Sequence, residues 1–142
     1  MANTRASIED IQLVNERSTF NRSCGFKIVS ACNGYAELAM DWRTDLAQSA
    51  GFLHAGLIAG LIDTGCGYAA ATVVGPVMAS HISVTCLRPG IGERFIARAK
   101  VLKSGRNQIF TVCELYAVSS GSEKLIATGE TLFVPVPTQL PG

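Results

Sequence analysis

Charged residues are scarce in this chain of 142 residues, and so are the residues that bind metals. Charged side chains make up only 16%, and 12 Lys and Arg against 11 Asp and Glu leave a net charge of +1. This balance gives no electrostatic reason to expect nucleic acid or a membrane surface as a partner. The only histidines are His54 and His81, and no CxxC pair occurs. No metal-ligand spacing can therefore be recognised, and we expect no metal site.

Targeting segments and disulfide patterns are also missing. The N-terminus lacks the apolar stretch of a signal peptide, and Glu9 and Asp10 argue against a transit peptide. Asp63 interrupts the longest apolar run, which falls short of the ~20 residues that a membrane span needs. We therefore expect a soluble cytoplasmic protein. An odd, scattered set of cysteines predicts buried free thiols in a reducing compartment: Cys24, Cys32, Cys66, Cys86 and Cys113.

Apolar residues are abundant, at 48%, and the length suits a single domain over residues 1–142 with its own core. Ser7 and Asp10 resemble a capping box, which predicts a short helix over about residues 7–17. Turn-forming residues then predict an irregular joint at residues 21–25. The apolar stretch of about residues 55–72 predicts one long central helix. Its four internal glycines each cost roughly 1 kcal/mol, so we expect another element to pack closely against it.

Strand patterns lie on both sides of this helix. Before the central helix, Asn33-Gly34 predicts a hairpin turn between two strands. Four strands follow it, and the turn residues between them predict a meander. The proline-rich tail should not continue the last strand. The sequence thus predicts an α+β fold, with an antiparallel sheet curved around one buried helix. The predicted strands cover residues 26–30, 35–41, 77–87, 93–103, 108–118 and 124–136.

Asp63 stands in the middle of the most apolar helix. A buried, unpaired carboxylate is costly, so the group must be protonated, hydrogen-bonded or facing a cleft. A structural role, bonding nearby backbone or lying on an exposed stripe, stays open. Catalysis is favoured because a carboxylate in an apolar cleft has a raised pKa and can serve as a base or nucleophile.

The start of the helix, His54-Ala55-Gly56, offers a second chemical group. The first N–H groups of a helix have no partner within it, and they can stabilise a developing oxyanion. Ala55 and Gly56 are small enough to let a carbonyl approach that backbone. His54 can be a structural histidine, or it can position the loop or the substrate.

The spacing of these two groups predicts a shared site. His54 and Asp63 are nine residues apart, which in an α-helix corresponds to ~900° of rotation and ~13 Å of rise. One helix cannot present both groups to the same carbonyl, whereas two antiparallel copies side by side can. If both groups are catalytic, the protein is at least a symmetric dimer with two shared sites.

The segment from Gly51 to Ala70 resembles the signature of the hot-dog thioesterase superfamily, in particular its PaaI-like branch (phenylacetic acid degradation). That signature runs approximately Asn-x-x-Gly-x-x-His-Gly-Gly, followed by an acidic residue and a run of small residues. Gln48 and Ala55 stand where the family has Asn and the first Gly. Weaker similarity covers Gly25, Asn33-Gly34, Thr85–Gly92 and Lys103–Arg106. The matches in type and spacing are Gly51, His54, Gly56 and Asp63.

The resemblance implies a hot-dog fold and the hydrolysis of an acyl-CoA thioester to free acid and coenzyme A, without any further cofactor. Asp63 of one subunit would activate water or attack the carbonyl, and amides near Ala55 and Gly56 of the other would stabilise the oxyanion. Gln48 keeps the amide that, in the family, helps to place the water or the thioester. The family's hydroxyl near the carboxylate is matched by Ser80, or by Ala79 if the register shifts by one residue.

Other residues are expected to contact the substrate. An acyl pocket is predicted around Gly51, Phe52, Leu57, Leu61 and Tyr68, together with the partner chain. Three cations in turns are candidates for the phosphates of coenzyme A, although a solvated turn explains them equally well. They are Arg88, Lys103 and Arg106.

We expect a homodimer or a homotetramer built as a dimer of dimers, with an acyl-CoA as the substrate and without nucleic acid or membrane as a partner. A non-catalytic acyl-CoA-binding or regulatory hot-dog domain is the main alternative. A thioester hydratase or dehydratase of the same fold and a purely structural dimerisation domain are two others. The identity of the acyl group does not follow from the sequence.

Overall fold

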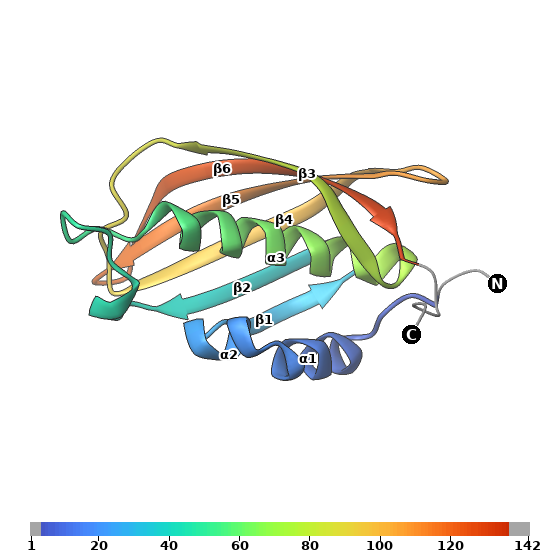
Figure 1. Ribbon diagram of the computed structural model, residues 1–142, viewed down its shortest axis with the longest axis horizontal. Coiled ribbons are helices and arrows are strands. Elements are labelled where there is room, and N and C mark those ends of the chain that lie inside the picture. The colour runs from blue at the N-terminus through green and yellow to red at the C-terminus, as the bar shows by residue number, and fades with distance from the viewer. Residues whose placement is uncertain (1–3, 137–142) are drawn as a thin grey trace.

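A six-stranded antiparallel sheet curves around one long helix, α3, in the computed structural model, which describes residues 4–136 (Figure 1). The predicted α+β arrangement is therefore confirmed. Two short helices at the N-terminus, α1 and α2, lie beside the outer strand β1. The elements are α1 (Ile8–Arg17), α2 (Thr19–Cys24), β1 (Lys27–Cys32), β2 (Tyr35–Asp41), a 3₁₀ turn (Thr44–Leu46), α3 (Ala55–Val74), β3 (Val77–Cys86), β4 (Arg94–Ser104), β5 (Ile109–Ser119) and β6 (Ser122–Pro135).

The strand order corrects one expectation. The strands are arranged β1-β2-β4-β5-β6-β3, so β4, β5 and β6 form a meander, but β3 pairs with β6 at the far edge instead of with β4. The reason is that α3 crosses the sheet and delivers the chain to the edge opposite β1. This pairing joins strands that are distant in the sequence, and no local turn signal specifies it. The tail beyond residue 136 lies outside the described residues.

The predicted hairpin turn and the predicted helix cap, which both depend on residues close in the sequence, are confirmed. Asn33 and Gly34 both have positive φ, 51° and 79°, as the tight hairpin turn between β1 and β2 requires. The Ser7 hydroxyl accepts a bond from the Asp10 N–H at 3.1 Å, and the Asp10 carboxylate accepts one from the Ser7 N–H at 2.9 Å. The bond from the Ser7 backbone lowers the pKa of Asp10.

The predicted joint at residues 21–25 is wrong in part, because it contains helix α2. Ser18 caps this helix through a bond from the Asn21 N–H, and Gly25 ends it with a φ of +76°. A helix of six residues is too short to show a helical periodicity in its sequence, which explains why turn-forming residues dominated the pattern.

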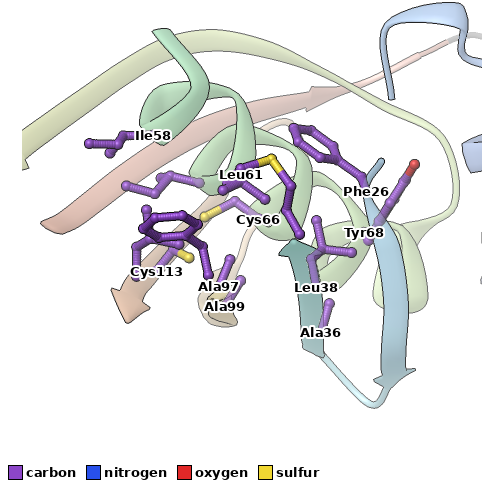
Figure 2. Close-up of a cluster of buried hydrophobic side chains, with 14 of the residues drawn as sticks. Phe26, Ala36, Leu38, Ile58, Leu61, Cys66, Tyr68, Ala97, Ala99 and Cys113 are labelled. Atoms are coloured by element: carbon purple, nitrogen blue, oxygen red, sulfur yellow. The ribbon is translucent and has the colours of Figure 1, made fainter. Parts of the chain in front are cut away.

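The glycines of α3 allow close packing against the sheet, which we expected because internal glycines lower the stability of a helix. A Cβ at Gly65 would meet the Cβ atoms of Ala99 and Ala97 at 3.5 and 3.8 Å, so helix and sheet approach each other through small residues. A hydrophobic core fills the remaining space between α3 and the sheet (Figure 2). By length and composition α3 could also cross a membrane. Here it is the central helix of the fold.

The edge strand β3 differs from the strands inside the sheet because most of its residues are exposed. Met78 is 61% and Ile82 44% exposed, although both are large and apolar. The expectation of five buried thiols fails for the two cysteines at the ends of edge strands, Cys32 and Cys86, which are exposed. The other three are buried, as predicted.

Candidate active site

Asp63 lies near the middle of α3 and is half-buried, with the Oδ1 atom of its carboxyl group fully buried. Its Oδ1 atom has no hydrogen-bond partner among residues 4–136. Burial raises the pKa of Asp63 because the charged form loses hydration and no neighbouring donor compensates. The side chain forms part of the wall of a cavity of about 650 Å³, a size typical of small-ligand sites. This is the environment in which a carboxylate acts as a base or nucleophile.

This cavity, which we call the acyl cavity, lies between α3, α1 and the first residues of β3. Asp63, Gly67 and Ala71 line it from α3 at four-residue spacing, so one face of the helix forms its floor. The other walls are largely apolar, which suits a hydrocarbon group more than a solvated one. They include Ile11, Val14, Val77, Ala79 and Phe133.

A buried polar network closes the side of the acyl cavity that faces α1 and α2. The Tyr68 hydroxyl donates to Oδ1 of Asn15 at 2.9 Å and accepts a bond from Nδ2 of Asn21 at 3.0 Å. In Figure 2 the Tyr68 hydroxyl points away from the hydrophobic cluster. Tyr68 was expected from the sequence, whereas both asparagines were missed. Asn15 could have been noticed, since it follows Ile11 by one turn on the buried stripe of α1.

The N-terminus of α3 has one free backbone donor. His54 caps the helix, and its Nδ1 atom accepts a bond from the Gly56 N–H at 2.8 Å. The N–H groups of Leu57 and Ile58 bond to the carbonyl of His54. Among residues 4–136 the Ala55 N–H then has no partner, and Ala55 is exposed. Ala55, rather than Gly56, therefore presents the amide that can reach an oxyanion.

A tight loop brings Gln48 beside this helix end. Gly51, with a φ of +91°, donates its N–H to the Gln48 carbonyl, and the Gln48 side-chain oxygen accepts a bond from the Ala50 N–H. Gln48, Phe52, Ala55 and Arg88 meet at a second cavity of about 390 Å³. Phe52 thus belongs to this cavity and not to the acyl cavity.

The two halves of the expected site are separate within one chain. Ala55 and Asp63 are eight residues apart on α3, a rise of about 12 Å, and they line different cavities. A single subunit therefore does not bring the amide and the carboxylate to one carbonyl.

Two other predicted contacts lie outside the acyl cavity. Ser80 is exposed at the bulge between Ala79 and His81, and its hydroxyl donates to the Leu132 carbonyl at 3.1 Å. Ala79 occupies the position beside the acyl cavity, because the bulge shifts the register by one residue. Leu57 is half-buried and packs against the core instead.

The three predicted cations fall at opposite ends of the sheet. The backbone N–H of Arg88 donates to the carbonyl of Ile126 on β6. Lys103 on β4 lies opposite Phe110 on β5, and Phe110 in turn lies opposite Leu132 on β6. Ile126 and Leu132 are six residues apart on β6, about 20 Å. Arg106 lies in the turn that follows Lys103.

Lys124 is a further cation, and no local sequence pattern predicted that it would join Arg88. It lines a third cavity of about 550 Å³ together with Arg88, Ser119 and Ser122. The second and third cavities share Arg88 and Pro89, so they adjoin. Two cations and two hydroxyls in one hollow form an environment that suits a phosphate group.

Comparisons with known proteins agree with this architecture. The family described as "Thioesterase superfamily" matches residues 50–124, which include the cap of α3 and Asp63. Acyl-coenzyme A thioesterase 13 of Homo sapiens is 30% identical over 130 residues, which cover 89% of this chain and 91% of that protein.

Solved structures show the same fold. A thioesterase family protein from Silicibacter pomeroyi has a TM-score of 0.86 and 32% identity, over 89% of this chain and 96% of that one. The PaaI protein of the phenylacetic acid degradation operon of E. coli has a TM-score of 0.82, over 92% and 93% of the two chains, at 21% identity. The fold is therefore the predicted hot-dog fold, and this chain belongs to the thioesterase superfamily.

Proposed function

We propose that the protein hydrolyses acyl-CoA thioesters at a site shared by two subunits. The observation that carries this proposal is Asp63, a half-buried residue whose carboxyl group has one buried, unpaired oxygen in the wall of a largely apolar cavity of about 650 Å³. Family membership supports thioester hydrolysis, and the name of the human relative supports coenzyme A as the carrier of the acyl group.

The chemistry needs a group that delivers oxygen to the carbonyl and a donor for the oxyanion. Asp63 either removes a proton from the attacking water or attacks the carbonyl carbon itself, forming an anhydride that water then cleaves. The Ala55 N–H of the second subunit stabilises the negative charge on the carbonyl oxygen. The carbon–sulfur bond breaks, and coenzyme A leaves as a thiolate that takes up a proton.

A second copy of the chain supplies the missing half of the site. Most residues of the edge strand β3 are exposed, and the strand borders the acyl cavity through Val77 and Ala79. Pairing of two β3 edges about a two-fold axis would place two α3 helices antiparallel and side by side. We propose a homodimer on this basis, or a homotetramer that contains it.

The phosphates of coenzyme A are assigned to the end of the sheet that carries Arg88. From the Ala55 amide, the second cavity leads to Arg88 and the third leads on to Lys124. Lys103 and Arg106 could contact the same nucleotide only if the partner subunit brings them there, because they lie at the opposite end of their own sheet.

The test is release of free thiol from a panel of aryl- and fatty-acyl-CoA esters. Wild type should hydrolyse at least one ester, and Asp63→Asn and Asp63→Ala should each lose ~10²-fold or more in kcat. Glu16→Gln, an exposed carboxylate of α1 away from the cavities, is the matched control and should keep full activity. Binding without hydrolysis by wild type would support the non-catalytic alternative instead. Asp63 variants as active as wild type would exclude Asp63 as the catalytic carboxylate.

A further inference from the structure

Thr64 follows Asp63 directly on α3, and both residues line the acyl cavity. Thr64 is half-buried, and the chemistry proposed above gives it no part. Threonine is not a favoured residue inside a helix, and its hydroxyl commonly bonds to a backbone carbonyl about one turn earlier. The hydrogen bonds of this hydroxyl therefore decide whether it serves the helix or is free for a ligand.

Thr72, on the same helix, shows the structural use of such a hydroxyl. It donates to the Ala69 carbonyl at 2.7 Å and accepts a bond from the Gly34 N–H at 2.7 Å. The residue is buried, and its hydroxyl ties the end of α3 to the hairpin between β1 and β2. Thr72 thus has a full set of partners within the chain.

The Thr64 hydroxyl, in contrast, has no hydrogen-bond partner among residues 4–136. The side-chain atoms in that part of the chain that are both unpaired and sealed from open space are Oδ1 of Asp63 and Oγ1 of Thr131. Oγ1 of Thr64 is not one of them, so it keeps some accessible surface. Because Thr64 lines the acyl cavity, a molecule bound in the cavity can reach this oxygen.

Other hydroxyls near the carboxylate are absent or already bonded in the described part of the chain. From β3, Ala79 lines the cavity, whereas the Ser80 hydroxyl is exposed and bonded to a backbone carbonyl of β6. Ser18 and Tyr68 also line the cavity, but the Ser18 hydroxyl caps α2 and the Tyr68 hydroxyl belongs to the asparagine network. The unpaired hydroxyl adjacent to the carboxylate is therefore that of Thr64.

Two consecutive side chains on this face can hold one small molecule between them. Their Cα atoms are about 3.8 Å apart, and the side chains diverge by about 100° around the helix. A water molecule that bonds to two oxygen atoms at about 2.7–2.8 Å each can bridge a gap of up to about 5.5 Å. The acyl cavity, of about 650 Å³, leaves room for such a water beside an acyl group.

We propose that the Thr64 hydroxyl positions the water that attacks the thioester, by accepting a hydrogen bond from the O–H group that Asp63 does not deprotonate. This inference rests on the proposed thioesterase function and takes its general-base route. Asp63 removes one proton from the water, the water oxygen bonds to the carbonyl carbon, and the carbon–sulfur bond breaks. Coenzyme A leaves as a thiolate and takes up the proton from Asp63. The second O–H bond passes intact into the acid product, so Thr64 neither gains nor loses a proton.

The test makes one substitution at two threonines of α3. Thr64→Val, which removes the hydroxyl at nearly constant volume, should lower kcat by ~10-fold with nearly unchanged KM and melting temperature. Thr64→Ser keeps a hydroxyl and should restore kcat to within about twofold of wild type. Thr72→Val loses two bonds inside the chain instead, so it should lower the melting temperature and keep kcat per folded enzyme.

A wild-type kcat in Thr64→Val would overturn the role of Thr64 and leave the thioesterase proposal intact. A loss of kcat that comes with a lower melting temperature or a smaller oligomer would also overturn it, because Thr64 would then be a packing residue.

Calorimetric binding of a non-hydrolysable acyl-CoA thioether analogue separates a contact to water from a contact to the acyl group. Equal affinity of wild type and Thr64→Val supports the inference, whereas ~10-fold weaker binding by the variant refutes it. Absence of hydrolysis by wild type with every ester would refute the thioesterase proposal itself, and this inference with it.

Discussion

The imidazole of His54 accepts a hydrogen bond at Nδ1 from the backbone N–H of Gly56, over 2.8 Å. Because Nδ1 uses its lone pair on this bond, the ring proton of the neutral imidazole resides on Nε2. The bond also withdraws the Gly56 N–H from any substrate. His54 therefore caps the helix, and the Ala55 N–H is left without a partner among residues 4–136.

Replacement of His54 separates capping from acid–base chemistry. His54→Ala should lower the free energy of unfolding by about 0.5–2 kcal/mol, because it removes the cap. His54→Asn supplies another capping acceptor and should restore most of the stability and of kcat. Thermal unfolding and kcat, measured for both variants, check this. An Asn variant that is stable but inactive would assign His54 a direct chemical role instead.

Ala55→Pro should remove the oxyanion donor without breaking α3. Proline is tolerated at the first position of a helix, and His54 has the extended conformation (φ −62°, ψ 136°) that a residue before proline prefers. We expect kcat to fall by ~10²–10³-fold with a nearly unchanged melting temperature. Ala55→Gly keeps the N–H group and serves as the control. Similar kcat values for the two variants would show that another group stabilises the oxyanion.

Two inactive variants should complement each other if the site is shared. Co-expression of Asp63→Asn with Ala55→Pro at equal amounts makes about half of the dimers mixed, and each mixed dimer holds one complete site of two. Activity should then recover to about a quarter of wild type, whereas separately purified variants stay inactive. No recovery, despite mixed dimers seen by differential tagging and mass spectrometry, would place both groups in one subunit.

Asp63→Asn should stabilise the protein at neutral pH. Burial raises the pKa of Asp63 in the folded state, so folding favours the protonated carboxyl group. That contribution is complete below the unfolded pKa and is lost as the pH rises through the folded pKa. We expect a gain of ~1–3 kcal/mol in unfolding free energy at pH 7–8 that shrinks as the pH falls through the folded pKa and is absent below about pH 4, the pKa of an unfolded Asp. Denaturant unfolding at several pH values measures the difference. A constant or negative difference would mean that the carboxylate is compensated.

Arg88→Ala and Lys124→Ala should weaken only the contacts to the nucleotide part of coenzyme A. Each should raise KM for an acyl-CoA by about threefold to tenfold, with a smaller effect at high salt, because both side chains are exposed and screened. The corresponding N-acetylcysteamine thioester has no phosphates, and its KM should not change. An equal rise for both substrates would contradict a phosphate contact. Lys103→Ala, at the other end of the sheet, tests whether the partner subunit contributes.

The sequence predicted elements that depend on neighbouring residues. The hairpin at Asn33-Gly34 and the Ser7–Asp10 cap rely on bonds or backbone angles within a few positions, and both are confirmed. The partial burial of Asp63 in an apolar helix also followed, because an apolar stretch of that length must be covered. Spacing along a helix obeys fixed geometry, so the separation of Asp63 from the helix start could be calculated from residue numbers alone.

Only the tertiary structure decided which distant residues meet. It set β3 beside β6, shifted Ser80 away from the cavity in favour of Ala79, and brought Arg88 and Lys124 to the wall of one cavity. It also joined Asn15, Asn21 and Tyr68, whose contacts span up to 53 positions. Such contacts depend on how the helices cover the sheet, and each residue taken alone carries no local signal of its partner. The position of Asp63 in an apolar helix was thus visible in the sequence, whereas the shape and polarity of its cavity emerged only on folding.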